Sequence, residues 1–252
     1  MRIDLNADLG EGFGVWQMGD DDALLEVVTS ANVACGFHAG DPSTMQRVCA
    51  AAAIRGVVIG AQVSYRDRAG FGRRRIDMAE DELSADVLYQ LGALNGFARA
   101  AGAAVRYIKP HGALYNSAAD DPVQARAVVS AAAAFDRTLP VLGLPGSALE
   151  AAAQSESISF VAEAFADRAY LPTGRLVPRS EPGAVHSAVD TVVAQALGIV
   201  RDAAVSAADG TPVTVRAASL CLHGDTPRAV ELARAVRAAL RDAGCTLAAF
   251  AP

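Results

Sequence analysis

Short apolar runs alternate with longer segments of helical spacing along the whole chain. Seven apolar runs have the length and the branched residues that are typical of buried strands. These strands are predicted at residues 3–7, 31–35, 57–61, 105–108, 141–144, 158–162 and 213–222. Helices are predicted at residues 20–28, 42–54, 81–101, from 121–122 onward, 184–201 and 228–240. This alternation indicates a parallel sheet with right-handed crossovers.

Polar residues follow at least five of the predicted strands, namely the first, second, fourth, sixth and seventh. In a doubly wound sheet a site gathers between a few strands, whereas a barrel collects loops from all around its rim. We therefore expect one α/β domain over residues 1–252, folded as a distorted (β/α) barrel of seven parallel strands.

The fourth strand leads into the segment with the densest candidate chemistry, RYIKPHGALYN at residues 106–116. Pro110 is expected to stop the strand, because proline cannot donate to a ladder. Lys109, His111, Tyr115 and Asn116 are then predicted at its carboxyl end, where parallel α/β proteins keep their active sites.

Other strands are predicted to deliver further polar groups to the same rim. These candidates are Asp8, Glu11, Asn32, His38, Asp41, Glu163, Asp167, Arg168, His223 and Asp225. Such a set can bind a divalent metal, or perform acid/base catalysis while Lys and Arg neutralise an anionic substrate. Asp41 also has a sufficient role as the cap of a helix that begins with Pro42. The residues alone indicate hydrolysis or lyase chemistry on a small polar substrate.

Several motif-based functions are not supported. The glycines at 10, 12 and 14 have the spacing GxGxG and enclose a carboxylate, so a dinucleotide fingerprint is disfavoured. HExxH, GxSxG and GxxxxGK[ST] do not occur, and no nucleotide cradle is recognisable. His186 is interpreted as a structural residue on a helix. The arginines at 66, 68 and 73–75 are typical of a solvated face, but beside a site they could hold a carboxylate or phosphate.

Composition limits the classes of binding partner and the cellular compartment that fit this chain. The net charge of −6 argues against a nucleic-acid surface, and four cysteines without a CxxC pair are typical of reduced thiols. The amino terminus lacks the pattern of a signal peptide, and the alanine-rich run at 125–134 is too short to cross a bilayer. We expect a cytoplasmic protein that binds neither nucleic acid nor membrane.

Six motifs occur in a fixed order along essentially the whole chain: DLNADLGE, SANVACGFHAGDP, YIKPHGALYN, EAFADRAY, LVPR and CLHGDTP. With them the chain resembles the lactam-utilisation family, which supplies the A subunit of ATP-dependent 5-oxoprolinase. The resemblance implies a (β/α) barrel related to polysaccharide-deacetylase-like and glycosidase-like folds. It also implies work with B and C subunits, converting 5-oxo-L-proline and water to L-glutamate with ATP as co-substrate.

The resemblance further implies roles for the candidate residues. Partner subunits would activate the lactam by phosphorylation, and this chain would open the ring. Asp8, His38 or His111 would position or deprotonate water, and Lys109 with Arg168 would hold the substrate carboxylate or phosphate. His223 and Asp225 would form a further acid/base pair. The substrate-binding set is Glu11, Asn32, Asp41, Tyr115, Asn116, Glu163, Asp167, Arg168 and Asp225.

One departure from the family pattern affects the metal question. Many members read GAHP where this chain has Gly60-Ala61-Gln62-Val63, and an amide is neither a base nor a good metal ligand. The sequence therefore assigns no metal. Two alternatives stay open: a metal-dependent deacetylase or amidohydrolase on a small polar substrate, and a non-catalytic binding subunit. The sequence also leaves open whether the chain forms a homo-oligomer.

Overall fold

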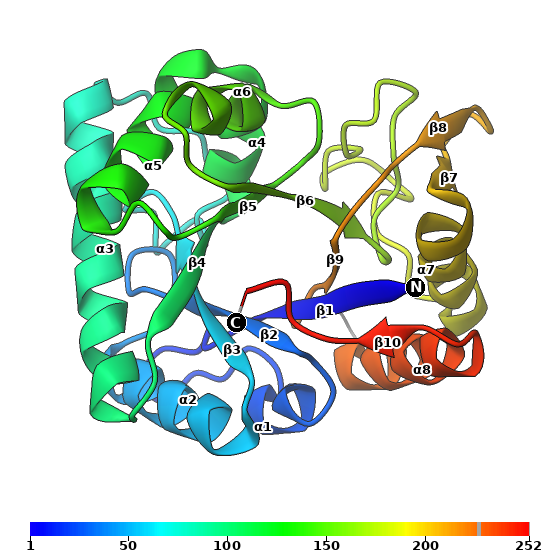
Figure 1. Ribbon diagram of the computed structural model, residues 1–252, viewed down its shortest axis with the longest axis horizontal. Coiled ribbons are helices and arrows are strands. Elements are labelled where there is room, and N and C mark those ends of the chain that lie inside the picture. Colours follow the sequence, from blue (N-terminus) through cyan, green and yellow to red (C-terminus); the bar gives the residue numbers. More distant parts are fainter. Residues whose placement is uncertain (226–227, 252) are drawn as a thin grey trace.

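Seven parallel strands close into a barrel in a computed structural model that describes residues 1–225 and 228–251. Thr226 and Pro227 of the last motif lie outside the described residues, as does Pro252. The barrel strands are β1 (Arg2–Leu9), β2 (Ser30–Ala34), β3 (Val58–Val63), β4 (Val105–Pro110), β5 (Val141–Gly143), β6 (Phe160–Phe165) and β9 (Ser219–Leu222). β9 pairs with both β6 and β1, which closes the ring (Figure 1). The predicted seven-stranded barrel is confirmed.

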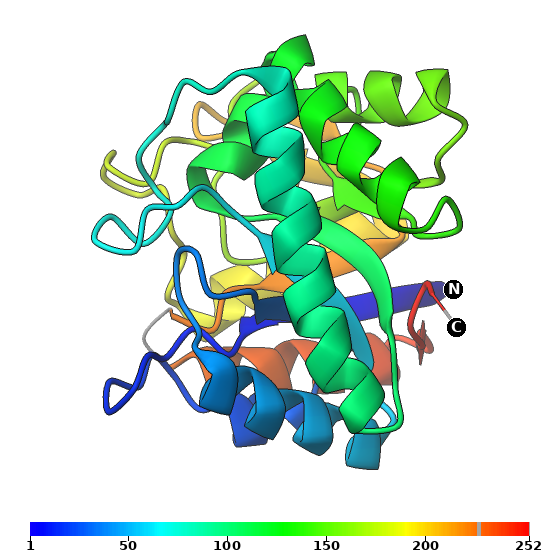
Figure 2. The ribbon, with the colours of Figure 1, turned by 90° about the vertical axis from the view of Figure 1, so that its left-hand side faces the viewer.

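Helices cover the outside of the barrel (Figure 2). They are α1 (Asp21–Leu25), α2 (Pro42–Arg55), α3 (Glu80–Ala100), α4 (Gly112–Asp120), α5 (Pro122–Phe135), α6 (Ala148–Ser155), α7 (Val189–Asp202) and α8 (Ala229–Asp242). α3 buries Leu83, Val87, Leu91 and Leu94 completely, and this spacing places them on one helical face. Burying each such side chain contributes about 1.5–3 kcal/mol. Among the described residues, no helix is both long and apolar enough to cross a bilayer.

The interior of the barrel is polar, although its outer wall is apolar. Asn6, Asn32 and Glu163 are fully buried there. Tyr107 also lies inside and donates its hydroxyl to Asn32 Oδ1 at 2.6 Å. A Cβ on Gly60 would come within 2.1 Å of the Tyr107 ring, so this position needs glycine for the ring to fit. The polar interior is the scaffold of the site.

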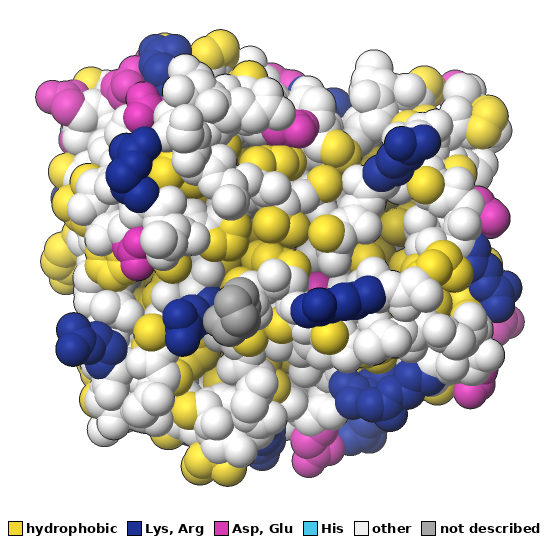
Figure 3. Space-filling view, in the orientation of Figure 1, with side chains coloured by type: hydrophobic (Ala, Val, Ile, Leu, Met, Phe, Trp, Pro, Cys, Tyr) yellow, Lys and Arg dark blue, Asp and Glu magenta, His cyan; other side chains and the backbone are white. Residues whose placement is uncertain are grey.

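The amino end of the barrel is closed by the carboxyl-terminal segment (Figure 1). β10 (Thr246–Leu247) pairs with the start of β1, and the Phe250 ring packs against Tyr107 at 4.8 Å between centroids. Hydrophobic side chains gather in the middle of this face, with Lys and Arg side chains around them (Figure 3). The long loops lie at the opposite end (Figure 2).

Four strands extend further toward their carboxyl ends than the sequence predicts. β1 continues through Asp8, β3 through Gln62, β4 through Lys109 and β6 through Glu163. β4 ends at Pro110, as expected, but it includes Lys109, because Pro110 is the last paired residue and its missing N–H affects only the end of the ladder. These polar residues therefore belong to the barrel wall.

Other element predictions need correction. The predicted strand at 213–222 is two strands, because β8 (Pro212–Thr214) pairs antiparallel with β7 (Ala204–Ser206) before β9 begins. His186 lies ahead of α7 and not on a helix, and its N–H donates to the Asp167 carbonyl. α1 ends at Leu25 and not at Val28. The hydrophobic pattern did not predict α4, α6, β7 or β10.

Candidate active site

A cavity of about 780 Å³ opens at the carboxyl ends of the strands. It lies at the end predicted for the site, and its size falls within the range of about 300–1,000 Å³ for small-molecule pockets. Seven of the predicted site residues line it: Asp8, Lys109, His111, Tyr115, Asn116, Arg168 and His223.

Lys109 forms the centre of a buried charge network at the base of this cavity. Its Nζ lies 2.8 Å from Glu163 Oε1 and 3.3 Å from Asp8 Oδ1. It also contacts Asn6 Oδ1 at 3.2 Å and Cys221 Sγ at 3.1 Å. Burial alone would lower the pKa of Lys109, but the two carboxylates raise it well above its ordinary value. The Lys109 side chain is therefore an ammonium ion, and its charge is balanced by the buried carboxylates of Asp8 and Glu163.

Asp8 is the ionised member of this network that faces the cavity. Its Oδ1 accepts from Asn32 Nδ2 at 2.8 Å and faces Lys109. Its Oδ2 points toward His111 Nδ1, 3.9 Å away. Burial would raise the pKa of Asp8, but the ammonium of Lys109 holds it well below its usual range. Asp8 can therefore orient a polar substrate or a water molecule through Oδ2.

Glu163 and Tyr115 complete the network behind Lys109. The Tyr115 hydroxyl donates to Glu163 Oε2 at 3.0 Å, and Asn6 Nδ2 donates to Glu163 Oε1 at 2.9 Å. Glu163 is fully buried and is not among the cavity-lining residues. It compensates the lysine and does not directly face a ligand.

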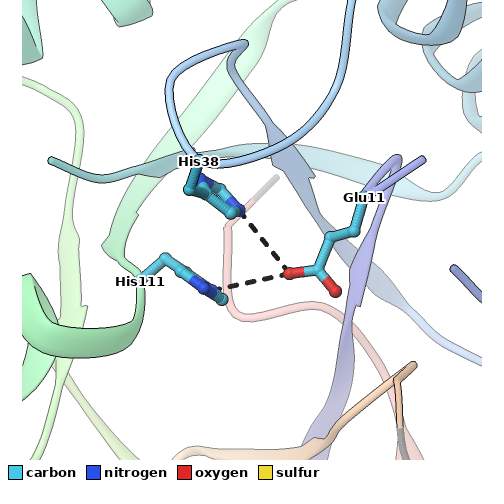
Figure 4. Close-up of side chains that lie close together, drawn as sticks. All are labelled: Glu11, His38 and His111. Carbon is cyan, nitrogen blue, oxygen red and sulfur yellow. Dashed lines mark ion pairs between the residues drawn. The ribbon is translucent and has the colours of Figure 1, made fainter. Parts of the chain in front are cut away.

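A second cluster, Glu11, His38, Gln62 and His111, lies beside Asp8 (Figure 4 shows the two histidines pointing at Glu11). Gln62 Nε2 donates to Glu11 Oε1 and to His111 Nδ1, each at 2.9 Å. The other ring nitrogen of His111 donates to the Phe71 carbonyl at 3.0 Å. Gln62 thereby fixes the tautomer of His111 with its proton on Nε2.

The acid/base properties of this cluster follow from its burial. Burial raises the pKa of Glu11 to about 7, and the nearby charge of Asp8 adds to the effect. Burial lowers the pKa of His38 to about 4, so this imidazole is neutral near pH 7. Burial and the neighbouring His38 lower the pKa of His111. Glu11 is the group of the cluster that can exchange a proton near neutral pH.

Glu11, His38 and His111 also offer ligand atoms within 4.8 Å of one another. Neither ring nitrogen of His38 has a hydrogen-bond partner among the described residues, which would suit a ligand. However, the His38 and His111 rings are stacked, with centroids 3.9 Å apart and planes 13° apart. Because the two ring planes are nearly parallel, an ion about 2.0–2.1 Å from a nitrogen of each ring would lie well out of at least one ring plane, away from its lone pair. In this arrangement the three residues do not fit a divalent metal.

His223 lies on another wall of the cavity. Its Nδ1 is 3.0 Å from Asp167 Oδ1, and its ring stacks on Phe165 with centroids 5.4 Å apart. Asp167 is buried outside the cavity lining and fixes the ring orientation. The opposite nitrogen, Nε2, is the one that can face a ligand.

Two predicted pairings need correction. The expected pair of His223 and Asp225 does not form among the residues that the structure describes, because His223 contacts Asp167 while Asp225 faces Arg73 and Arg179. Lys109 and Arg168 were expected to hold a substrate anion together, but Lys109 is compensated by Asp8 and Glu163. Arg168 donates Nε to the Ala184 carbonyl and Nη2 to the Val177 carbonyl, so it also anchors a loop.

Three further candidates have structural partners. Asp41 caps α2 by accepting from the amides of Ser43 and Thr44, and it does not line the cavity. Asn32 supports Asp8 from below the cavity, and Asn116 donates to the Gly112 carbonyl within α4. The predicted substrate-binding role of Asp41 therefore has no support from its position.

The structure brings four further residues to the site. The sequence assigned no role to Asn6 or Arg179, marked Gln62 only as a departure from the family pattern, and placed Arg73 only in the arginine cluster of residues 66–75. Asn6 and Gln62 lie within strands and hydrogen-bond to the buried carboxylates. Arg73 and Arg179 line the cavity and face Asp225. Arg73 belongs to the arginine cluster and Arg179 to the LVPR motif, but only the fold shows that the two side chains lie together.

Comparison with known proteins gives the family. The family profile described as LamB/YcsF matches residues 3–252. The chain belongs to the LamB/YcsF family. A family relative from Streptomyces coelicolor, named as the A subunit of 5-oxoprolinase, is 63% identical and covers 99% of this chain and 100% of its own.

Solved structures agree with this assignment to the LamB/YcsF family. A lactam utilization protein from Thermus thermophilus has a TM-score of 0.94 and 45% identity, covering 99% of this chain and 100% of its own. A family 4 carbohydrate esterase from Streptomyces lividans has a TM-score of 0.52 and 11% identity, covering 98% and 91%. The latter shows a likeness of fold alone, in agreement with the expected α/β barrel.

Proposed function

We propose that this chain is the A subunit of an ATP-dependent 5-oxoprolinase, in which its cavity opens the ring of 5-oxo-L-proline. The observation that carries the proposal is the ionised Asp8 at the base of a cavity, held beside the buried ammonium of Lys109. The names of the S. coelicolor and T. thermophilus relatives support the substrate class.

Water attacks the ring carbonyl carbon of the phosphorylated lactam and the carbon–nitrogen bond breaks, which leaves an acyl phosphate. A second water hydrolyses this acyl phosphate to the side-chain carboxylate of glutamate and inorganic phosphate. The departing nitrogen takes up a proton and becomes the amino group of glutamate. Asp8 Oδ2 orients the attacking water, and Glu11, whose pKa is about 7, takes up the proton that this water releases, while His111 is held 3.5 Å from Glu11 Oε1. His223 presents Nε2 to the cavity and is the donor for the leaving nitrogen.

ATP enters the proposal because a lactam is a stable amide. Phosphorylation of the lactam oxygen makes its carbon more electrophilic, so a carboxylate with a low pKa is sufficient to orient the water. We assign this activation to the B and C subunits, with ATP as co-substrate of the whole complex. The relatives are named as one subunit of an enzyme, which supports such partners.

Reconstitution tests the proposal. Glutamate release from 5-oxo-L-proline and ATP is measured for this chain with and without candidate B and C subunits. We expect glutamate only from the complete mixture. ATP consumption without glutamate, in a mixture whose partners are active with another family member in place of this chain, would overturn the assignment.

The alternative of a metal-dependent deacetylase is favoured by one observation, the unpartnered nitrogens of buried His38. It requires His38 to turn out of its stack with His111. Metal analysis of the dialysed protein separates the two functions. One bound equivalent that disappears in His38→Phe would favour the deacetylase.

A further inference from the structure

At one wall of the cavity Arg73 and Arg179 pair with the carboxylate of Asp225, and Arg168 lies close enough to feel the charges of both arginines. Arg73 Nη2 lies 2.5 Å from Asp225 Oδ2, and Arg179 Nη2 lies 3.8 Å from Asp225 Oδ1. Arg168 is 5% exposed, and burial together with the charges of Arg179 and Arg73 lowers its pKa to about 10. All three arginines line the cavity.

The charges of this arginine cluster are not balanced within the protein. Three guanidinium groups lie near two carboxylates, Asp225 and Asp167, which leaves one positive charge in excess. The nearby Asp167 is engaged by His223, with Nδ1 3.0 Å from Oδ1. Since like charges repel more strongly where water is scarce, a cluster of this kind is stabilised by an anionic ligand.

The cluster is also held in place before a ligand arrives. Arg168 uses Nε and Nη2 on the carbonyls of Ala184 and Val177. No hydrogen bond within the described part of the chain uses its Nη1. Arg179 follows this anchored segment by two residues, and Arg73 comes from the loop after β3. Guanidinium groups match the oxygens of phosphate through paired N–H donors, which ammonium groups cannot do.

We propose that Arg73, Arg168 and Arg179 form a phosphoryl subsite, which binds the dianionic phosphoryl group of a phosphorylated substrate inside the cavity. A phosphoryl group offers three terminal oxygens, one for each guanidinium group, whereas a carboxylate offers two. The inference rests on the proposed function, because it takes the activated lactam as the ligand. Anion binding is thereby assigned to the three arginines and not to Lys109, which is already compensated by Asp8 and Glu163.

Calorimetric titration of the full chain, without lactam, ATP or partners, tests the subsite. The probes are inorganic phosphate at pH 8 and acetate, at constant ionic strength. We expect phosphate to bind at least about tenfold more tightly than acetate. Arg73→Gln and Arg179→Gln should each weaken phosphate binding by about 10- to 100-fold, the effect of one charge-assisted hydrogen bond.

Two further variants make the result specific. Arg179→Lys keeps the charge but loses the paired donors, so it should bind phosphate with intermediate affinity. Arg126→Gln removes an arginine on α5 that pairs with Glu80 outside the cavity, so it should bind phosphate as the unmodified chain does. Circular dichroism checks that each variant is folded.

The outcomes separate this inference from the proposed function. Equal affinity for phosphate and acetate, or unchanged phosphate binding in the folded Arg73→Gln and Arg179→Gln variants, would overturn the subsite. Loss of phosphate binding in both variants would support it. If phosphate binds as expected but the complete mixture releases no glutamate, only the assignment to lactam opening fails.

Discussion

The two halves of the site differ in how completely their polar groups are satisfied. Around Lys109, an ammonium faces two carboxylates and each has further hydrogen-bond partners. In the neighbouring cluster, both nitrogens of His38 and Oε1 of Gln62 are buried without a hydrogen-bond partner among the described residues. A compensated network fixes geometry, whereas spare buried hydrogen-bonding capacity is kept for a ligand or a moving proton.

The largest expected effect comes from removing the charge at the centre of the compensated half. Lys109→Met leaves the carboxylates of Asp8 and Glu163 buried without their cation. We expect the free energy of unfolding, measured by urea denaturation, to fall by about 3–5 kcal/mol. Arg126→Met, at an exposed ion pair, is the control and should change it by less than about 1 kcal/mol. Equal stability of the two variants would show that the network is not a structural centre.

A smaller, pH-dependent effect is expected from Glu11. Its pKa is about 7 in the folded chain and near the ordinary 4.5 when unfolded. The folded state thus favours the protonated form, so the stability that Glu11 contributes is present below pH 4.5 and is lost as the pH rises through 7. Glu11→Gln cannot ionise, so the variant should not lose this stability as the pH rises.

Urea denaturation at pH 5 and pH 8 measures this difference. The stability of Glu11→Gln relative to the unmodified chain should be greater at pH 8, by an amount on the order of a few kcal/mol. A difference between the two chains that does not change with pH would contradict the raised pKa of Glu11.

The smallest effect on stability is expected at His38. His38→Phe removes two nitrogens that have no hydrogen-bond partner among the described residues, and it keeps an aromatic ring against His111. The free energy of unfolding should stay within about 1 kcal/mol, while glutamate release by the complete mixture falls. A large loss of stability with unchanged turnover would place His38 in the structural half.

The alternation of strands and helices was sufficient to predict the barrel, but not where its strands end. Asp8, Lys109 and Glu163 were predicted to follow strands, because a hydrophobic pattern assumes an apolar interior. This barrel has a polar interior, so its strands continue through charged residues. Pro182 and Gly183, which precede α7, were the signal that could have placed His186 outside the helix.

The pairings within the site depend on the closed barrel and could not be predicted. Arg73 and Asp225 are 152 residues apart in the chain and form an ion pair. Gln62 lies between Glu11 and His111 only because β3 places it there. The sequence correctly indicated which end of the strands carries the polar residues, but not which of them compensate one another.

Glutamate release by Asp8→Asn in the complete mixture of subunits tests the central claim most directly. The substitution keeps the shape of the side chain and removes the charge, so turnover should fall by about 10²- to 10⁴-fold. Asp22→Asn, whose side chain is 60% exposed, is the control and should leave turnover unchanged. If folded Asp8→Asn releases glutamate as fast as the control, the cavity around Asp8 is not where the lactam ring opens.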